Sequence, residues 1–530
     1  MSFTHHDELQ LLGLLAAVAC LLVLVPRLRV PYPILLVLGG LALGFAPGLP
    51  DLSLPPDLVL IAILPPLIYS AAFFTSLRDF RVNIRPISLL AVGLVAVTTV
   101  GVAAVAHAWI DGFTWPAAFV LGAVVSPTDA IAATTIARRL GVPRRIVTII
   151  EGEALVNDGT ALVIYKAAVA ATVTGSFSLW TSSGRLVLNV VGGVAIGLVV
   201  GRIVRMVRAR TMSAAPSITL ALLTGYFAFL PADFLGVSGV LAVATAGVYM
   251  GWHTPQLTTV ETRLQGDAFW EILTFLVNSL VFLLVGLQLP HILDRLSGGS
   301  PTALIGDGAL AAGAVIVIRL LWIYPFTYGP RFLFRRIRER DPYPNWRAPT
   351  LIGWTGMRGA VSLAAALAIP LSTDAGHPFP QRDLIVFLTF CVILGTLVFQ
   401  GLLLPLVIRV LGLEDDDSDE REEAKARIKA AEAALERLDE LGDEDWVRDD
   451  TAERMRGLYR FRTDRFRARF DDGDDGAIEE QSTNYQRLRR ELLDAERRRV
   501  VQLRNEGYIS DDVMNRVQRD LDLEDSRLEI

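Results

Sequence analysis

The chain has 530 residues, of which 52% are hydrophobic, and its mean hydropathy is +0.44. This is more apolar than a soluble core requires, so the composition indicates a polytopic membrane protein and argues against a soluble globular one. The formal net charge of −6 hides a division, because residues 1–411 are net basic and residues 412–530 are net acidic. We therefore expect a transmembrane domain, 1–411, and a charged C-terminal domain, 412–530.

Apolar windows of roughly 20 residues, the length needed to cross about 30 Å of hydrocarbon, recur through the first domain. Thirteen candidates lie near 9–25, 33–47, 58–76, 86–110, 115–137, 146–173, 186–207, 216–231, 235–251, 270–290, 303–330, 350–370 and 383–411. Every second loop is basic, as in the run from Arg138 to Arg145. Because cytoplasmic loops hold the excess of Lys and Arg, we expect a multi-pass protein of the cytoplasmic membrane with its N-terminus outside and its C-terminus in the cytoplasm.

The fifth predicted span is interrupted by Ser126-Pro127-Thr128-Asp129. Pro127 lacks an N–H and clashes with the preceding turn, so this span cannot run as an unbroken helix. Backbone groups freed at membrane depth survive only where protein or a polar cavity satisfies them. Ser126, Thr128 and Asp129 offer oxygen ligands to a hard cation at this break. A simple proline kink with capping side chains is the alternative interpretation.

The sixth predicted span contains three acids, Glu151, Glu153 and Asp158. Acids at that depth are costly and mark functional sites. At about 100° per residue, Glu153 and Asn157 fall on one face of the helix and Glu151 and Asp158 on another. Different faces suggest different tasks, and Glu151, near the inner end, is interpreted as hydrated.

Asp158, near the middle of that helix, is the first candidate for the group that exchanges a proton for a cation, with Asp129 reaching toward it from the break. Glu153 needs a basic partner if it is ionised at that depth. Arg319 in the eleventh span or Arg358 in the twelfth could supply the positive charge.

The twelfth predicted span is interrupted by glycines and by Arg358 within the run from Gly353 to Gly359. If spans one to six and eight to thirteen form two inverted repeats, the fifth member of each repeat is the broken one. Interruptions at corresponding positions of two halves indicate a transporter site at the bilayer midplane. Since glycine is common in membrane helices, a coincidence is the alternative.

No cofactor or enzymatic activity is predicted. The sequence contains no H-E-x-x-H pattern, no glycine-rich nucleotide loop and no paired nucleophile and base. Cys20 and Cys391 both lie in apolar spans and are interpreted as free thiols. We expect membrane lipid but no nucleic acid among the partners, and a tail of short charged helices from their helical apolar spacing.

Four motifs together resemble the monovalent cation:proton antiporter family, which includes bacterial NhaP-type antiporters and animal sodium/proton exchangers. They are Leu64-Pro-Pro-Leu67, Ser126-Pro-Thr-Asp129, Glu151-Gly-Glu-Ala-Leu-Val-Asn-Asp158 and Gly356-Met-Arg-Gly-Ala360. Each motif alone is weak, but their order across about 400 residues is specific, and the tail looks like that of the bacterial branch. The resemblance implies a homodimer of thirteen-helix subunits in which a mobile core domain, containing broken helices five and twelve, gives alternating access.

The resemblance also assigns roles to residues of this chain. The family's cation- and proton-binding positions and its structural ion pair map onto Asn157, Asp158, Asp129, Glu153 and Arg319, with Arg358 beside the twelfth-helix break. The transported cation would be held by Asp158, Asp129 and Thr128. Members with Asn-Asp at the central pair are expected to exchange one proton for one cation without net charge transfer.

Two positions depart from the family pattern. Ser70 stands where many relatives place an acid after the Leu-Pro-Pro-Leu run, and Ala154 stands where relatives have a serine. Lys166, the only lysine before the tail, adds a positive charge two turns beyond Asp158. It either snorkels to the outer interface or pairs with a carboxylate.

The predicted function is exchange of Na⁺, with Li⁺ or K⁺ as alternatives, for H⁺ in pH homeostasis. One carboxylate that binds either a proton or a cation couples the two fluxes by competition. A K⁺/H⁺ antiporter is the close alternative, because the sequence does not fix the size of the cavity. A membrane sensor that signals through the tail is the remote one.

Overall fold

A computed structural model of the chain describes most positions from residue 30 onward, together with a few between 13 and 23. The continuous described segments are 30–46, 58–175, 179–211, 213–296, 300–413, 418–442, 446–468 and 477–526. The first predicted span, 9–25, lies largely outside them. The described residues are helical, and their only β pairing is an isolated bridge between Ser372 and Pro378. Two compact units, Met1–Glu414 and Asp415–Ile530, make up the chain.

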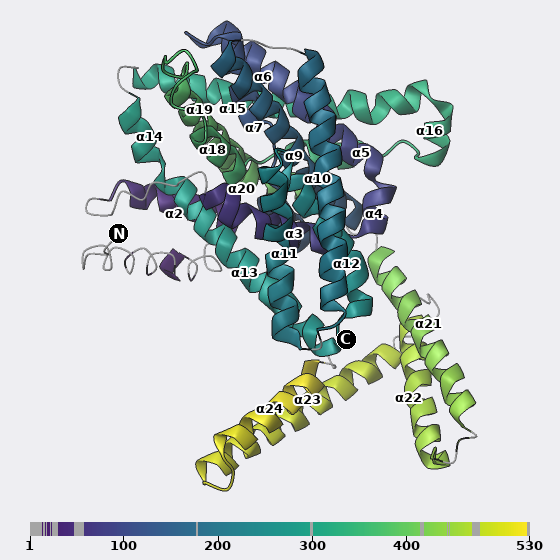
Figure 1. Ribbon diagram of the computed structural model, residues 1–530. Coiled ribbons are helices and arrows are strands. Elements are labelled where there is room, and N and C mark those ends of the chain that lie inside the picture. Colours follow the sequence, from purple (N-terminus) through teal and green to yellow (C-terminus); the bar gives the residue numbers. More distant parts are fainter. Residues whose placement is uncertain are drawn as a thin grey trace. The chain divides into compact units, whose positions relative to one another are not determined.

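The first unit is a bundle of helices of unequal length (Figure 1). Its described residues include three short π-helical segments. Its elements are α2 (Tyr32–Gly44), η1 (Leu58–Ile63), α3 (Leu64–Phe74), α4 (Leu77–Val82), α5 (Ile84–Ser88), η2 (Leu89–Leu94), α6 (Val95–Trp109), α7 (Trp115–Val125), α8 (Ala130–Arg139), α9 (Arg144–Thr174), α10 (Leu179–Arg208), α11 (Ala214–Phe234), α12 (Gly239–Leu257), α13 (Val260–Leu287), α14 (Leu289–Arg295), α15 (Pro301–Leu333), α16 (Arg335–Arg340), α17 (Arg347–Trp354), α18 (Ala360–Leu367), α19 (Arg382–Leu394), η3 (Gly395–Gln400) and α20 (Gly401–Leu411).

Within the described residues, eight helical segments are long and apolar enough to cross a membrane. They are Ile84–Trp109, Trp115–Arg139, Arg144–Thr174, Val187–Arg208, Ala214–Phe234, Val260–Arg295, Pro301–Leu333 and Arg382–Leu411. Tyr32–Gly44 and Val59–Phe74 are shorter apolar helices. The predicted all-α polytopic membrane fold is therefore confirmed, while the number thirteen and the orientation of the termini stay predictions.

Both predicted interruptions are confirmed. Helix α7 ends at Val125, and α8 begins at Ala130 after an extended segment that contains Pro127. The Asp129 carboxylate caps α8 by accepting a hydrogen bond of 2.8 Å from the amide of Ile131. Helix α17 ends at Trp354 with Thr355 as its C-cap residue, and α18 begins at Ala360.

The two interrupted segments contact each other through their backbones. The amide of Asp129 donates a hydrogen bond of 2.8 Å to the carbonyl of Met357. Gly359 lies so close to the side chain of Asp129 that a Cβ atom there would collide with the carboxylate. Thr396, on η3, accepts a hydrogen bond of 3.1 Å from the amide of Arg358. Glycine at position 359 thus permits the close approach that places Asp129 against the second interruption.

In the described part of the second unit, four amphipathic helices pack in two pairs. Helix α21 (Ser418–Leu441) packs on α22 (Asp449–Ala468), and α23 (Ala477–Asn505) packs on α24 (Asp511–Ser526). Arg456 and Asp439 form a 2.9 Å ion pair across the first of these pairs. Leu493 and Leu521 are buried in the second unit, on α23 and α24 respectively. Because exposed ion pairs contribute little, we attribute the packing chiefly to the apolar faces.

Candidate functional site

A cavity of about 570 Å³ lies beside the contact between the two interrupted segments. Its walls come from α2, α3, α8, α9, α13 and the start of α18. Of the residues predicted to bind the cation, Thr128, Asp129 and Asp158 line this cavity, whereas Ser126 and Asn157 do not. The structure therefore brings together one acid from each of the fifth and sixth predicted spans.

The two carboxylates of the cavity differ in their partners. Asp129 uses one oxygen to accept the amide of Ile131, which leaves its second oxygen free of that bond. Asp158 is half-buried on the wall formed by α9, and no side chain or backbone group among the described residues hydrogen-bonds its carboxylate. Two negative charges in a partly sheltered cavity repel each other more strongly than they would in water. A cation or a proton bound there relieves that repulsion.

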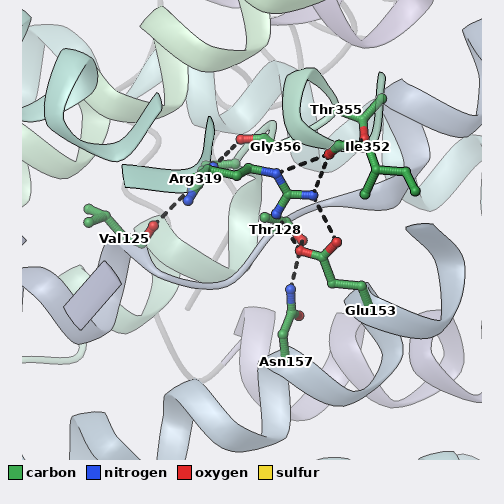
Figure 2. Close-up of polar contacts among 9 residues, drawn as sticks. Val125, Thr128, Glu153, Asn157, Arg319, Ile352, Thr355 and Gly356 are labelled. Carbon is green, nitrogen blue, oxygen red and sulfur yellow. Dashed lines mark hydrogen bonds and ion pairs between the residues drawn. The ribbon is translucent and has the colours of Figure 1, made fainter. Parts of the chain in front are cut away.

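Glu153, on the neighbouring face of α9, forms a buried ion pair with Arg319 of α15. Its carboxylate accepts two parallel hydrogen bonds of 2.5 and 2.8 Å from the guanidinium (Figure 2). Glu153 is 1% exposed and Arg319 is fully buried. Arg319 also donates bonds of 2.9 and 3.2 Å to the carbonyl of Ile352 in α17. The two-pronged pair and its extra acceptor join α9, α15 and α17 at one point.

Thr128 connects this ion pair to the first interruption. Its hydroxyl donates a 3.1 Å hydrogen bond to Glu153 and accepts one of 2.7 Å from the side-chain amide of Asn157 (Figure 2). A hydroxyl oxygen has two lone pairs, so one remains after these two contacts. Asn157 is completely buried, and its carbonyl oxygen has no hydrogen-bond partner in the described part of the chain. Asn157 thus supports Thr128 from behind and does not itself line the cavity.

Arg358 and Ser126 also lie outside the cavity. The Arg358 guanidinium donates a 3.0 Å hydrogen bond to the carbonyl of Val125 and a further one to the carbonyl of Gly356. It therefore places positive charge at the C-terminal end of α7, where the helix dipole is negative. The hydroxyl of Ser126 donates a 2.9 Å bond to Ala123. Both side chains thus donate hydrogen bonds to backbone carbonyls at the interruption. The residues alone left Arg319 and Arg358 open as partners of Glu153, and the structure pairs Glu153 with Arg319.

The two positions that depart from the family pattern and the added Lys166 lie in different surroundings. Ser70 and Ala154 line the cavity, and the Ser70 hydroxyl donates a 3.0 Å bond to Leu67 within its own helix. Neither residue adds charge to the site. Lys166 lies outside the cavity with a side chain that is 62% exposed, and its ammonium is 3.7 Å from the Asp233 carboxylate. This contact agrees with the second interpretation of Lys166, in which it pairs with a carboxylate.

Helix α13 contributes polar residues to the cavity that the sequence reasoning missed. Asp267, Glu271, Thr274 and Asn278 all line it. They recur every three or four residues, so they form one polar stripe on an otherwise apolar helix. This spacing is visible in the sequence. It was missed because the predicted span began at residue 270 and was identified from its hydropathy alone.

Comparisons with known proteins agree with these features. Residues 13–410 match the family described as sodium/hydrogen exchanger, transmembrane. An uncharacterized Na⁺/H⁺ exchanger from Mycobacterium tuberculosis is 38% identical over 526 residues, which are 98% of this chain and 95% of that protein. The low-affinity Na⁺/H⁺ antiporter of Synechocystis is 31% identical over 84% of this chain and 82% of its own length.

A further relative is the sodium, potassium, lithium and rubidium/H⁺ antiporter of Bacillus subtilis. It is 34% identical over 391 residues, which cover 71% of this chain and 58% of that protein. Among solved structures, the sodium proton antiporter of Methanocaldococcus jannaschii superimposes with a TM-score of 0.62 at 19% identity. The match covers 77% of this chain and 99% of the archaeal chain, and it concerns the fold.

Replacing Glu153 by Gln is expected to destabilise the protein, because Arg319 would keep a buried charge without its counter-ion, at a cost of about 3–5 kcal/mol. Thermal unfolding of the purified protein measures this as a clear fall in melting temperature. Glu151→Gln is the matched control on the same helix, since Glu151 pairs with Arg138 at 2.6 Å and both side chains are accessible to solvent. Equal melting temperatures for the two variants would show that the buried pair is dispensable.

Proposed function

Since this chain belongs to the sodium/hydrogen exchanger family, we propose that it exchanges Na⁺ for H⁺ across the cytoplasmic membrane, with Asp158 as the group that binds either ion. The observation that carries this proposal is the pair of carboxylates, Asp129 and Asp158, on one cavity beside an interrupted helix. Neither acid has an arginine or lysine partner among the described residues, in contrast to Glu153. A negative site of this kind needs a mobile positive ion for compensation.

The ligand chemistry fits a small hard cation. Carboxylate oxygens of Asp158 and Asp129 and the hydroxyl of Thr128 are the oxygen donors that such ions prefer. A proton on Asp158 removes the charge that attracts the cation, so the two ions compete for one site. If the site changes its access from one side of the membrane to the other only when an ion is bound, this competition couples inward movement of one ion to outward movement of the other.

The cavity opens toward the side predicted to be cytoplasmic. Arg138 and Glu151, which pair at its edge, lie at the C-terminal end of α8 and near the N-terminal end of α9. Arg139 ends α8 and Arg144 begins α9, so basic residues flank the short connection between these helices. We therefore interpret the structure as the inward-facing member of an alternating-access cycle. The proposed homodimer follows from the family resemblance, and the proposed cytoplasmic position of the tail follows from the alternation of basic loops.

Potassium is a second candidate for the transported cation. The Bacillus subtilis relative carries sodium, potassium, lithium and rubidium in its name. Ser70 leaves the cavity wall uncharged where many relatives have an acid, and fewer fixed charges hold a small ion less tightly. Comparing Na⁺, Li⁺, K⁺ and Rb⁺ as driving ions in proteoliposomes distinguishes the two candidates.

Asp158→Asn should abolish exchange, because the amide keeps the shape of the side chain but can neither carry a proton nor offer a negative charge. Cation-driven pH change in proteoliposomes should fall to the level of protein-free vesicles. Asp233→Asn is the matched control, since Asp233 lies outside the cavity and is 53% exposed. Normal flux from a well-folded Asp158→Asn variant would refute the proposed role of this carboxylate.

Exchange should also be electroneutral. One Na⁺ or one H⁺ on the acid pair leaves the same net charge on the moving site, whereas transfer of one net charge would couple to voltage by about 2.3 kcal/mol per 100 mV. Na⁺-driven flux should therefore be unchanged when valinomycin and K⁺ set a membrane potential. A voltage dependence that disappears in Lys166→Gln would show instead that this lysine takes part in coupling despite its contact with Asp233.

A further inference from the structure

A second cavity, of about 120 Å³, shares no lining residue with the first. It lies where three membrane spans have their ends, because Arg85 and Arg145 stand at the start of their spans and Arg331 stands near the end of its own. All three arginines line the cavity. These span ends are joined to the basic loops, so the cavity lies at the membrane surface that we predict to be cytoplasmic.

The charges around this cavity do not balance. Asp341 is the only acid in its lining, and three arginines share that one carboxylate. Arg331 approaches it to 2.5 Å, Arg145 to 3.2 Å and Arg85 only to 4.0 Å. The lining therefore has a formal excess of two positive charges. Arg85 is the most weakly held member of the cluster and the one best placed to accept another anion.

Hydrogen-bond donors are left over in the same place. Nη2 of Arg85 and the indole Nε1 of Trp322 are both buried, and neither has a hydrogen-bond partner among the described residues. Both residues line the cavity. A buried donor without a partner costs roughly 1–3 kcal/mol. An anion with several acceptor oxygens would satisfy the two donors and balance part of the charge at once.

Apart from Thr327, the rest of the lining is apolar or aromatic, which favours a lipid over a free ion as the ligand. Leu89 and Ile149 are among the lining residues. The Trp322 ring, which also lines the cavity, stacks on Phe326 with ring centroids 3.4 Å apart. A free phosphate gains nothing from such a wall, whereas an acyl chain would bury apolar surface against it. Basic pockets between membrane helices on the cytoplasmic side bind anionic lipid head groups.

We propose that this cavity binds the phosphate group of an anionic phospholipid from the adjacent leaflet. The bound lipid would bridge the N-terminal ends of α5 and α9 and the C-terminal end of α15. Helices α9 and α15 are also the two that the Glu153–Arg319 pair connects. Lipid binding is therefore expected to stabilise the same part of the bundle, independently of which cation is transported.

Thermal unfolding of delipidated protein in neutral detergent tests the proposal. Added phosphatidylglycerol should raise the melting temperature by several degrees, and phosphatidylcholine or millimolar inorganic phosphate should raise it much less. In Arg85→Gln, about ten times more phosphatidylglycerol should be needed for the same rise in melting temperature. This is the scale of one lost charge-assisted hydrogen bond. Arg139→Gln is the matched control, because Arg139 belongs to the same basic side but does not line the cavity.

Each other outcome overturns the assignment. Equal responses to phosphatidylglycerol in wild type and Arg85→Gln would remove this arginine from any lipid site. Inorganic phosphate acting as strongly as the lipid would identify a site for a soluble anion. Equal effects of the two lipids would show that the charge is irrelevant. If Arg85→Gln does not fold, Trp322→Phe decides, since it keeps an aromatic ring beside Phe326 and removes the indole N–H together with part of the ring. An unchanged lipid response in that variant contradicts the proposal.

Discussion

A charged group inside a membrane protein persists only when a counter-charge and hydrogen bonds replace the water it has lost. Glu153 and Arg319 meet this requirement for each other, and the other polar contacts of the interior are arranged around them. The carbonyl of Ile352 accepts two further hydrogen bonds from the arginine, and the hydroxyl of Thr128 donates one to the carboxylate. Through these contacts one ion pair fixes the ends of both interrupted helices.

The acids of α9 illustrate how one helix serves two purposes. Glu153 and Asp158 are five residues apart, which places them on different faces. On one face the charge is neutralised and immobile, and on the other it faces a cavity with no basic partner in the described residues. Thr128 lies between these environments, because its hydroxyl bonds to Glu153 while the residue itself lines the cavity. The structural pair thus positions Thr128, the proposed ligand of the ion, while lying outside the cavity itself.

Residue chemistry alone predicted the interruptions, because proline and clustered glycines in an apolar run leave few other conformations. The partner of Glu153 could not be chosen in the same way. Arg319 and Arg358 are both buried arginines, and only the packing of the bundle shows that Arg358 is taken by the backbone of Val125 and Gly356. Ser126 was likewise ambiguous, since a hydroxyl at a helix end can face a cavity or its own preceding turn.

The polar stripe of α13 shows a different limit. Hydropathy averages over a window, so it hides four polar residues that share one face, although their spacing is visible in the sequence. Residue chemistry therefore singled out the two acids that the structure places on one cavity, Asp129 and Asp158, while the full extent of the cavity depended on how the helices pack. The stripe makes the approach to Asp158 polar from a second helix.

Competition between Na⁺ and H⁺ for Asp158 is the central claim, and calorimetric titration of the purified protein with Na⁺ tests it most directly. Repeating the titration in buffers with different ionisation enthalpies counts the protons released for each Na⁺ bound. The account predicts a release that approaches one proton as the pH falls, with an apparent Na⁺ affinity that weakens by up to about tenfold per pH unit. Binding of Na⁺ with no proton release at any pH would contradict it.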